Sequence, residues 1–109
     1  MFGISNLTRV YICTGATDGR LGYEGLKALT VKKIQQDPMC GHLMIFCNAA
    51  RNRIKIFWWD GTGFYIAAKR MRRGGFDFPK DGGAVAKMSL AQLDALLKGV
   101  DFVRRPPNR

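Results

Sequence analysis

The stretch from Arg51 to Pro79, RNRIKIFWWDGTGFYIAAKRMRRGGFDFP, decides the fold. Two runs of β-branched and aromatic residues, 54–59 and 64–68, flank the tetrapeptide Asp-Gly-Thr-Gly at 60–63. This pattern is typical of a β-hairpin, and a glycine suits the first central position of a type II′ turn because it tolerates positive φ. We therefore predict a two-residue Gly61-Thr62 loop that sets Trp59 opposite Phe64.

The two tryptophans of the hairpin should lie on opposite faces of the sheet. Successive side chains of a strand alternate between faces, so Trp58 shares a face with Tyr65, whereas Trp59 shares one with Phe57. The face of Trp59 carries the heavier apolar load. We therefore predict that Trp59 is part of the core. Trp58 and Tyr65 are predicted to lie on the more open face, as a candidate partner-binding surface.

Positive charge is concentrated at the open end of the same hairpin. The chain of 109 residues has a formal net charge of +10, from 18 Lys and Arg against 8 Asp and Glu. The segment 51–73 holds seven of these basic residues and one acidic residue. We call the seven the basic collar: Arg51, Arg53, Lys55, Lys69, Arg70, Arg72 and Arg73. A field of this kind favours a polyanion, most often nucleic acid, whereas the alternative is a basic protein whose charge only prevents association.

The remainder of the chain predicts one α+β domain over residues 1–103, with a mostly antiparallel sheet around the hairpin and a flexible basic tail at 104–109. Helical spacing of apolar residues predicts an amphipathic helix over 21–36, and Ser89 with Gln92 has the capping-box spacing of a second helix that ends at Gly99. Short apolar runs predict the other strands, at 10–13, 42–47 and 76–78. Residues 80–87 are predicted to be a loop and 100–103 to pack back on the sheet.

The sequence does not favour an enzyme. DNA strand transfer requires carboxylates that converge on divalent metal ions. The acidic residues stand in unrelated contexts, such as the tight turn at Asp60, and Asp18 is predicted to pair with Arg20 or to cap a helix. His42 opens an apolar strand and is predicted to be a packed or hydrogen-bonded imidazole. We therefore predict no catalytic residues and no cofactor, with a metal-dependent nuclease as the weakest alternative.

The cysteines indicate a reducing compartment. Cys13, Cys40 and Cys47 form an odd set without a CxxC pair, which does not fit a secreted disulfide framework. A zinc site is not expected either, because the chain has one histidine. The longest apolar run, 43–47, is too short to span a bilayer, and residues 1–9 do not have the pattern of a secretory signal. We expect a cytoplasmic protein with no membrane association.

Several motifs together resemble one family. Thr14-Gly15-Ala16-Thr17-Asp18-Gly19-Arg20 with Gly25-Leu26 resembles the opening of the TnpB-type accessory protein, the second open reading frame, of the IS-66 family of bacterial insertion sequences. Asp37-Pro38 before Gly41-His42-Leu43 is similar to a second segment of that family. Ser89-Leu90 and Gln92-Leu93, followed by Gly99-Val100-Asp101-Phe102, are similar to its final helix and ending. The likeness covers nearly the whole chain, but Cys40 and Cys47 stand where the family pattern has small polar and basic residues.

This resemblance implies a helper in transposition, encoded beside a separate transposase that performs the chemistry. From the residues, we expect the basic collar to bind DNA phosphates with little sequence readout. The alternative is a protein adaptor that docks on the transposase through the apolar sheet face of Trp58 and Tyr65. Homo-oligomerisation stays possible under both hypotheses.

Overall fold

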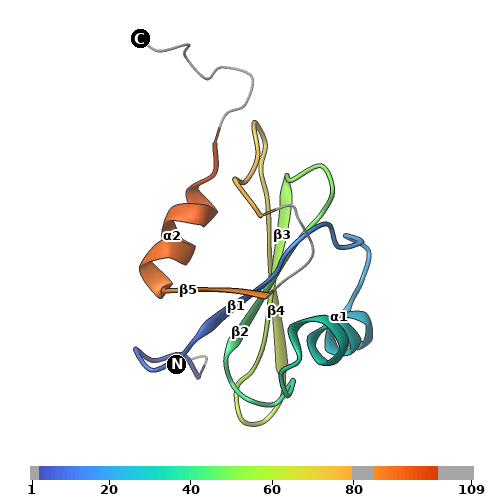
Figure 1. Cartoon of the computed structure of the whole chain (residues 1–109), viewed down its shortest axis with the longest axis vertical. Coiled ribbons are helices and arrows are strands. Elements are labelled where there is room, and N and C mark those ends of the chain that lie inside the picture. Colours follow the sequence, from blue (N-terminus) through green and yellow to red (C-terminus); the bar gives the residue numbers. More distant parts are fainter. Residues whose placement is uncertain (1–2, 80–84, 101–109) are drawn as a thin grey trace.

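The hairpin is part of a five-stranded sheet in a computed structural model that describes residues 3–79 and 85–100 (Figure 1). In the described residues the strand order is β4-β3-β2-β1-β5. The strands are β1 (Val10–Cys13), β2 (Leu43–Cys47), β3 (Arg53–Trp59), β4 (Phe64–Arg70) and β5 (Val85–Met88). β1 and β2 are parallel, joined by a helical crossover, and the other neighbouring pairs are antiparallel. This arrangement confirms the predicted α+β class and mostly antiparallel sheet.

The hairpin has the predicted register. Trp59 pairs with Phe64 and Trp58 with Tyr65. At the turn, the Asp60 amide donates to the Gly63 carbonyl at 3.0 Å, and Gly61 has a φ of +108°. The Asp60 carboxylate accepts from the amides of Thr62 at 2.9 Å and Gly63 at 3.0 Å. These bonds lower the pKa of Asp60 and keep its carboxylate charged in the turn.

Two helical segments flank the sheet at the predicted places. Helix α1 (Tyr23–Leu29) continues into a π-helical turn (Thr30–Ile34) and ends at Gln35 with a φ of 60°, close to the predicted 21–36. Helix α2 (Leu90–Lys98) begins at the predicted capping box, in which the Ser89 hydroxyl accepts from the Gln92 amide and the Gln92 side chain accepts from the Ser89 amide. Gly99 ends α2 with a φ of +76°; a Cβ there would lie 2.5 Å from Met71 Cε.

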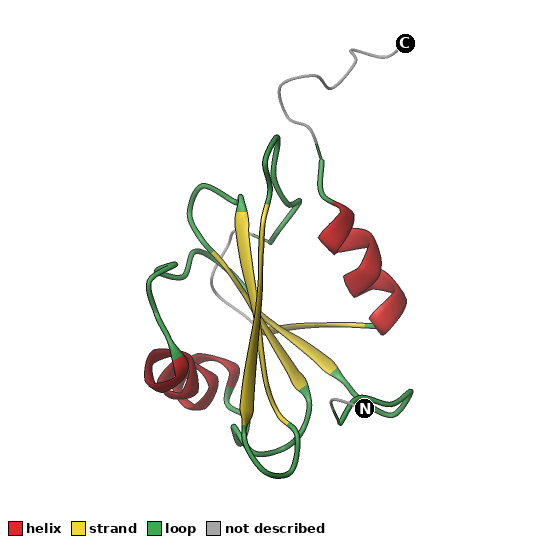
Figure 2. Ribbon diagram, turned by 180° about the vertical axis from the view of Figure 1, so that it is seen from behind, coloured by secondary structure: helices red, strands yellow, loops and turns green. Residues whose placement is uncertain are grey.

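Each face of the sheet has its own hydrophobic core, because α1 and α2 lie on opposite sides of it (Figure 2). On the α1 side, Leu26 and Ile34 pack against the sheet residues Tyr11, Cys13, Met44, Phe46 and Phe57. On the α2 side, Leu93 packs with residues of three strands and of the segment after β4: Val10, Ile12, Leu43, Ile45, Cys47, Ile54, Trp58, Phe76 and Phe78.

The predicted burial of the two tryptophans is wrong. Trp58 is 7% exposed within the α2-side core, whereas Trp59 is half-buried. The reason is that Leu26 of α1 and Ile34 of the π-helical turn belong to a core that includes Phe57 but not Trp59. Trp59 is in the last β3–β4 pair before the hairpin turn. On the other face, α2 and Phe76 reach Trp58.

The prediction of a strand at 76–78 is also wrong. Gly75 forms an isolated bridge with Val100, with N–H···O distances of 2.7 and 2.6 Å, and Phe76 and Phe78 insert into the α2-side core from an irregular segment. The last strand is β5, which falls at the end of the predicted 80–87 loop and pairs with β1. Residues 80–84 and the tail 104–109 lie outside the described residues, as do 101–103.

Candidate nucleic-acid interface

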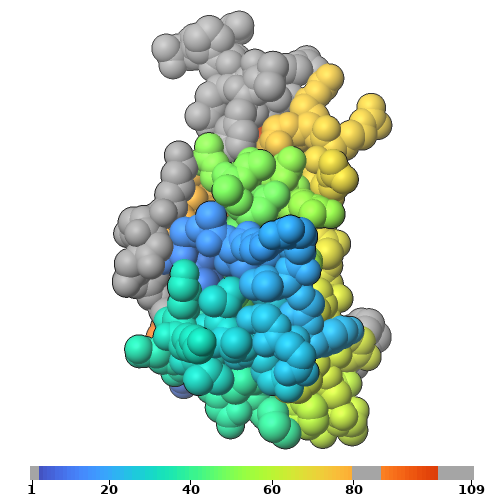
Figure 3. All heavy atoms as spheres, turned by 90° about the vertical axis from the view of Figure 1, so that its right-hand side faces the viewer, coloured from blue at the N-terminus to red at the C-terminus, as the bar shows by residue number. Residues whose placement is uncertain are grey.

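The residues of the basic collar meet at one end of the sheet. In the β3–β4 ladder Arg53 stands directly opposite Arg70, and Lys69 stands opposite Ile54. Arg51 belongs to the turn before β3, and the remaining two arginines follow β4. Figure 3 shows this end at the top, where the green segment around residue 50 adjoins the yellow-orange segment that follows β4. The fold therefore gathers the seven predicted residues at one end of the molecule.

The two lysines of the collar are anchored to opposite sides of the sheet. Lys55 Nζ donates to the Leu21 carbonyl at 2.6 Å, just before α1. Lys69 Nζ donates to the Leu97 carbonyl at 2.5 Å, in the last turn of α2. The last carbonyls of a helix have no partner within the helix and carry partial negative charge, so a cation is favourable there. Both lysines thus attach a helical layer to the hairpin and still add positive charge to this end.

The collar arginines that are exposed to solvent include Arg53, Arg70 and Arg72. Their guanidinium groups make no salt bridge to a carboxylate of residues 3–79 or 85–100. A hollow of about 410 Å³ lies between the two strand ends, lined by Asn52, Arg70, Met71 and Arg72. An anion can therefore approach these arginines without displacing a carboxylate of the described chain.

Asn48 organises the turn that carries Arg51 and Arg53 of the collar. Its Oδ1 accepts from the amides of Asn52 at 3.1 Å and Arg53 at 3.0 Å, and its Nδ2 donates to Asn52 Oδ1 at 2.8 Å. The Asn48 carbonyl accepts from the Arg51 amide at 3.0 Å, and Arg51 takes the left-handed conformation with a φ of 58°. The sequence reasoning missed this role, although an Asn at the start of a short polar loop commonly bonds the amides that follow it.

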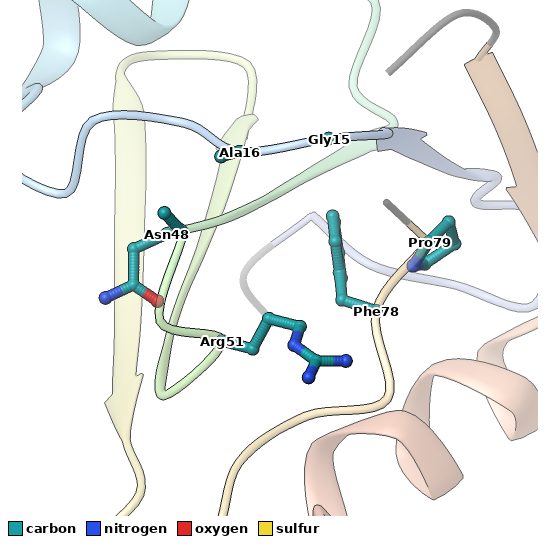
Figure 4. A pocket seen from close by; sticks show the side chains of 7 residues that line it. Gly15, Ala16, Asn48, Arg51, Phe78 and Pro79 are labelled. Atoms are coloured by element: carbon teal, nitrogen blue, oxygen red, sulfur yellow. The ribbon is translucent and has the colours of Figure 1, made fainter. Parts of the chain in front are cut away.

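A cavity of about 280 Å³ lies beside the same turn, on the α2 side. Figure 4 shows its lining, with the Arg51 guanidinium extending towards the ring of Phe78 and small residues closing the other side. The lining consists of Gly15, Ala16, Asn48, Ala49, Arg51, Phe78 and Pro79. Arg51 is the charged residue of this lining, which otherwise consists of Asn48 and of small or apolar residues.

The acidic residue Asp18 lies beside part of the collar. Asp18 lines a shallow hollow with Arg53 and Lys55, and its carboxylate pairs with Arg20 at 2.9 Å, as predicted. Hydrogen bonds from the Arg20 side chain and amide lower the pKa of Asp18 to about 2. Asp18 therefore stays ionised at neutral pH and offsets part of the positive field on the α1 side.

The other residue types that could take part in catalysis or metal binding are one histidine and three cysteines. His42 Nδ1 accepts from the Arg9 amide at 2.9 Å, which confirms the predicted hydrogen-bonded imidazole. The thiols of Cys13, Cys40 and Cys47 are free, and burial raises the pKa of Cys47 to about 11. Within the described ranges, no three His, Cys, Asp or Glu side chains are close enough together to hold a metal ion. In the same ranges no helix is both long and apolar enough to cross a bilayer.

Comparison with known proteins gives a family match over most of the chain. The family model described as IS66 Orf2 like protein, TnpB_IS66, matches residues 8–106. The chain is 39% identical over 95 residues to the uncharacterized protein y4hO of Sinorhizobium fredii strain NBRC 101917 / NGR234, covering 86% of this chain and 82% of that protein. It is 32% identical over 104 residues to the uncharacterized protein y4jC of the same strain, covering 95% and 89%. No solved structure matches the chain.

The chain therefore belongs to the IS66 Orf2-like family of insertion-sequence accessory proteins. This confirms the family suggested by the Thr14–Arg20 segment and by the Ser89–Gln92 helix start. Both relatives are uncharacterized, so their names assign no activity to either of them.

Proposed function

We propose that this accessory protein binds DNA phosphates through the basic collar and performs no chemistry itself. The observation that carries the proposal is the set of exposed guanidinium groups on Arg53, Arg70 and Arg72 at one end of the sheet, without described carboxylate partners. Guanidinium groups bind phosphate oxygens through paired, charge-assisted hydrogen bonds. The anchored Lys55 and Lys69 extend the positive field to both faces.

The arrangement of the collar residues supports binding to the DNA sugar-phosphate backbone rather than direct readout of the bases. The collar residues come from strand ends and turns, whereas direct readout uses a helix or a β-ribbon inserted in the major groove. Phosphate contacts fix position on the duplex and carry no sequence information. We therefore expect similar affinity for unrelated duplexes of the same length, which gives the transposition machinery a general DNA contact.

The test is a pair of charge-matched double variants. Arg70→Glu with Arg72→Glu should abolish binding to a labelled duplex, whereas Lys32→Glu with Lys33→Glu, on the exposed π-helical turn, should retain most of it. Both pairs change the net charge equally. For the native protein, log affinity against log salt should have a slope of about −0.9 for each phosphate neutralised. Equal losses in the two double variants would contradict a localised site.

An adaptor role is the alternative, and the exposure of Tyr65 is the observation that favours it. Tyr65 is 38% exposed, although Trp58 beside it is buried and α2 covers much of that face. In this case Tyr65→Ala should weaken capture of the element's transposase while the collar variants do not. DNA affinity that is unchanged by the Arg70 and Arg72 substitutions, together with loss of capture in Tyr65→Ala, would favour the adaptor.

A further inference from the structure

The outer edge of β4 is the feature that the proposed function does not use. Among the described strands β4 pairs only with β3, so it is one edge of the sheet. It is seven residues long and contains no proline. Tyr65, Ala67, Ala68, Lys69 and Arg70 are exposed along it. An edge of this length presents a row of backbone donors and acceptors that can pair with another strand.

The ladder to β3 determines which backbone groups face outward. The Asp60 amide donates to Gly63 at one end of the hairpin, and the Met71 amide donates to Asn52 at the other. Hydrogen-bonded and non-hydrogen-bonded pairs alternate along an antiparallel ladder. The odd-numbered residues of β4 therefore bond β3, whereas the amides and carbonyls of its even-numbered residues, 64 to 70, point away from the sheet.

We propose that β4 pairs in antiparallel fashion with β4 of a second copy of this chain, with Ala67 of both copies at the two-fold axis. In this register the β4 strands of the two copies overlap along their whole length. Residues whose backbone groups face outward in one copy pair with outward-facing residues of the other. Tyr65 of each copy then lies opposite Lys69 of the other, and Phe64 opposite Arg70. A guanidinium group is attracted to the face of an aromatic ring, so the pairing of Phe64 with Arg70 is favourable. The small Ala67 side chains meet at the centre, where the strands are closest.

Charge selects this register over its neighbours. With Ala67 at the axis, the two Lys69 residues are four positions apart along the sheet edge, which is about 14 Å and beyond the Debye length of about 8 Å at physiological salt. If the axis were at Ala68, the two Lys69 residues would be two positions apart, which is about 7 Å. Moving the axis to Ile66 places Lys69 opposite Gly63 and shortens the overlap. The bond from Lys69 Nζ to Leu97 also holds this charge over the α2 face rather than over the edge.

The experiment uses engineered disulfides in the full chain with Cys40→Ser, since Cys13 and Cys47 are buried. At a non-hydrogen-bonded antiparallel pair the Cα atoms are about 4.5 Å apart, within the range that a disulfide bridges. Ala67→Cys should therefore form a disulfide-linked dimer under mild oxidation. Ala68→Cys is the matched control, because two copies of residue 68 are diagonal across the axis, at more than about 7 Å. We expect about tenfold less linked dimer from the control.

A second measurement does not depend on a cysteine variant. Sedimentation equilibrium of the native chain should show a concentration-dependent dimer, and Ala68→Pro should shift it to monomer. This substitution removes an outward amide and leaves the β3 ladder intact. A native chain that stays monomeric at high concentration would overturn the proposal. It would also fail if Ala67→Cys and Ala68→Cys were linked equally, or if Ala68→Pro were folded and still dimeric.

Discussion

The indole ring of Trp58 lies flat on the phenol ring of Tyr65, with centroids 5.0 Å apart and ring planes at 19°. Trp58 is 7% exposed and Tyr65 is 38% exposed, so the pair joins the α2-side core to the surface. Stacked aromatic pairs of this geometry contribute stability beyond the area that they bury. Tyr65 therefore covers the part of Trp58 that lies towards the edge of the sheet, beside the part that packs in the α2-side core.

The first prediction concerns the two tryptophans. Trp58→Ala should lower the free energy of unfolding by about 3–5 kcal/mol, because it leaves a cavity in a packed core. Trp59→Ala should cost about 1–2 kcal/mol, because its side chain is only partly buried. Urea unfolding followed by circular dichroism measures both values. A larger loss for Trp59→Ala would contradict the burial described above.

The second prediction concerns Asn48. Asn48→Ala should lower the free energy of unfolding by about 1–3 kcal/mol, since the amides of Asn52 and Arg53 lose their acceptor. Asn48→Asp is the matched control: it keeps the accepting oxygen and loses only the bond to Asn52 Oδ1. The free energy of unfolding, measured by chemical denaturation, should therefore be highest for the native chain, lower for Asn48→Asp and lowest for Asn48→Ala. The reverse order of the two variants would show that Oδ1 is not the important group.

The third prediction concerns pH. Burial, followed by the positive charge of Arg9, lowers the pKa of His42 from its usual 6.5, and its Nδ1 must be unprotonated to accept from the Arg9 amide. The unfolded chain therefore binds a proton at higher pH than the folded chain. Unfolding free energy should be at its full value above about pH 6.5 and should fall as the pH is lowered towards 5.

His42→Asn is the control for this effect, because an amide oxygen can accept from Arg9 without titrating. Its urea midpoints at pH 8, 7, 6 and 5 should change less than those of the native chain. Parallel pH profiles for the two proteins would assign the effect to other groups.

The fourth prediction concerns thiol reactivity. Cys40 is half-buried, whereas Cys13 and Cys47 are buried and burial raises the pKa of both thiols, that of Cys47 to about 11. The thiolate is the reactive form. At pH 8 an aromatic disulfide reagent should therefore label Cys40 rapidly and the other two only as the domain opens. Cys40→Ser should remove the rapid phase; a rapid phase that persists in this variant would place a reactive thiol elsewhere.

The hairpin register was predictable because its determinants are local. Asp60 and Gly61 define a tight turn, and the turn fixes every pair up to Arg53 and Arg70. The capping box at Ser89 was predictable for the same reason. The positions of the collar residues follow from this register together with the concentration of charge in residues 51–73.

The remaining features depend on contacts between distant segments. Strand β5 is four residues long and is defined by pairing with β1, more than 70 residues earlier, so its own sequence carries little signal. Periodicity assigned Trp58 and Trp59 to opposite faces but could not tell how far α1 and α2 extend over them. The role of Asn48 was not predicted because this residue is neutral and positions Arg51 and Arg53 through hydrogen bonds with their backbone amides.

The place of β1 in the sheet has a consequence for the order of folding. β1 lies between β2, which follows it by about 30 residues, and β5, which follows it by more than 70 residues. The β2–β3–β4 meander can form from neighbouring segments, whereas β1 keeps one unpaired edge until residue 88 has been made. A chain interrupted before β5 would expose the backbone of β1 and the α2-side core together. Pairing of β5 with β1 is therefore the step that protects the nascent protein from association through the β1 edge.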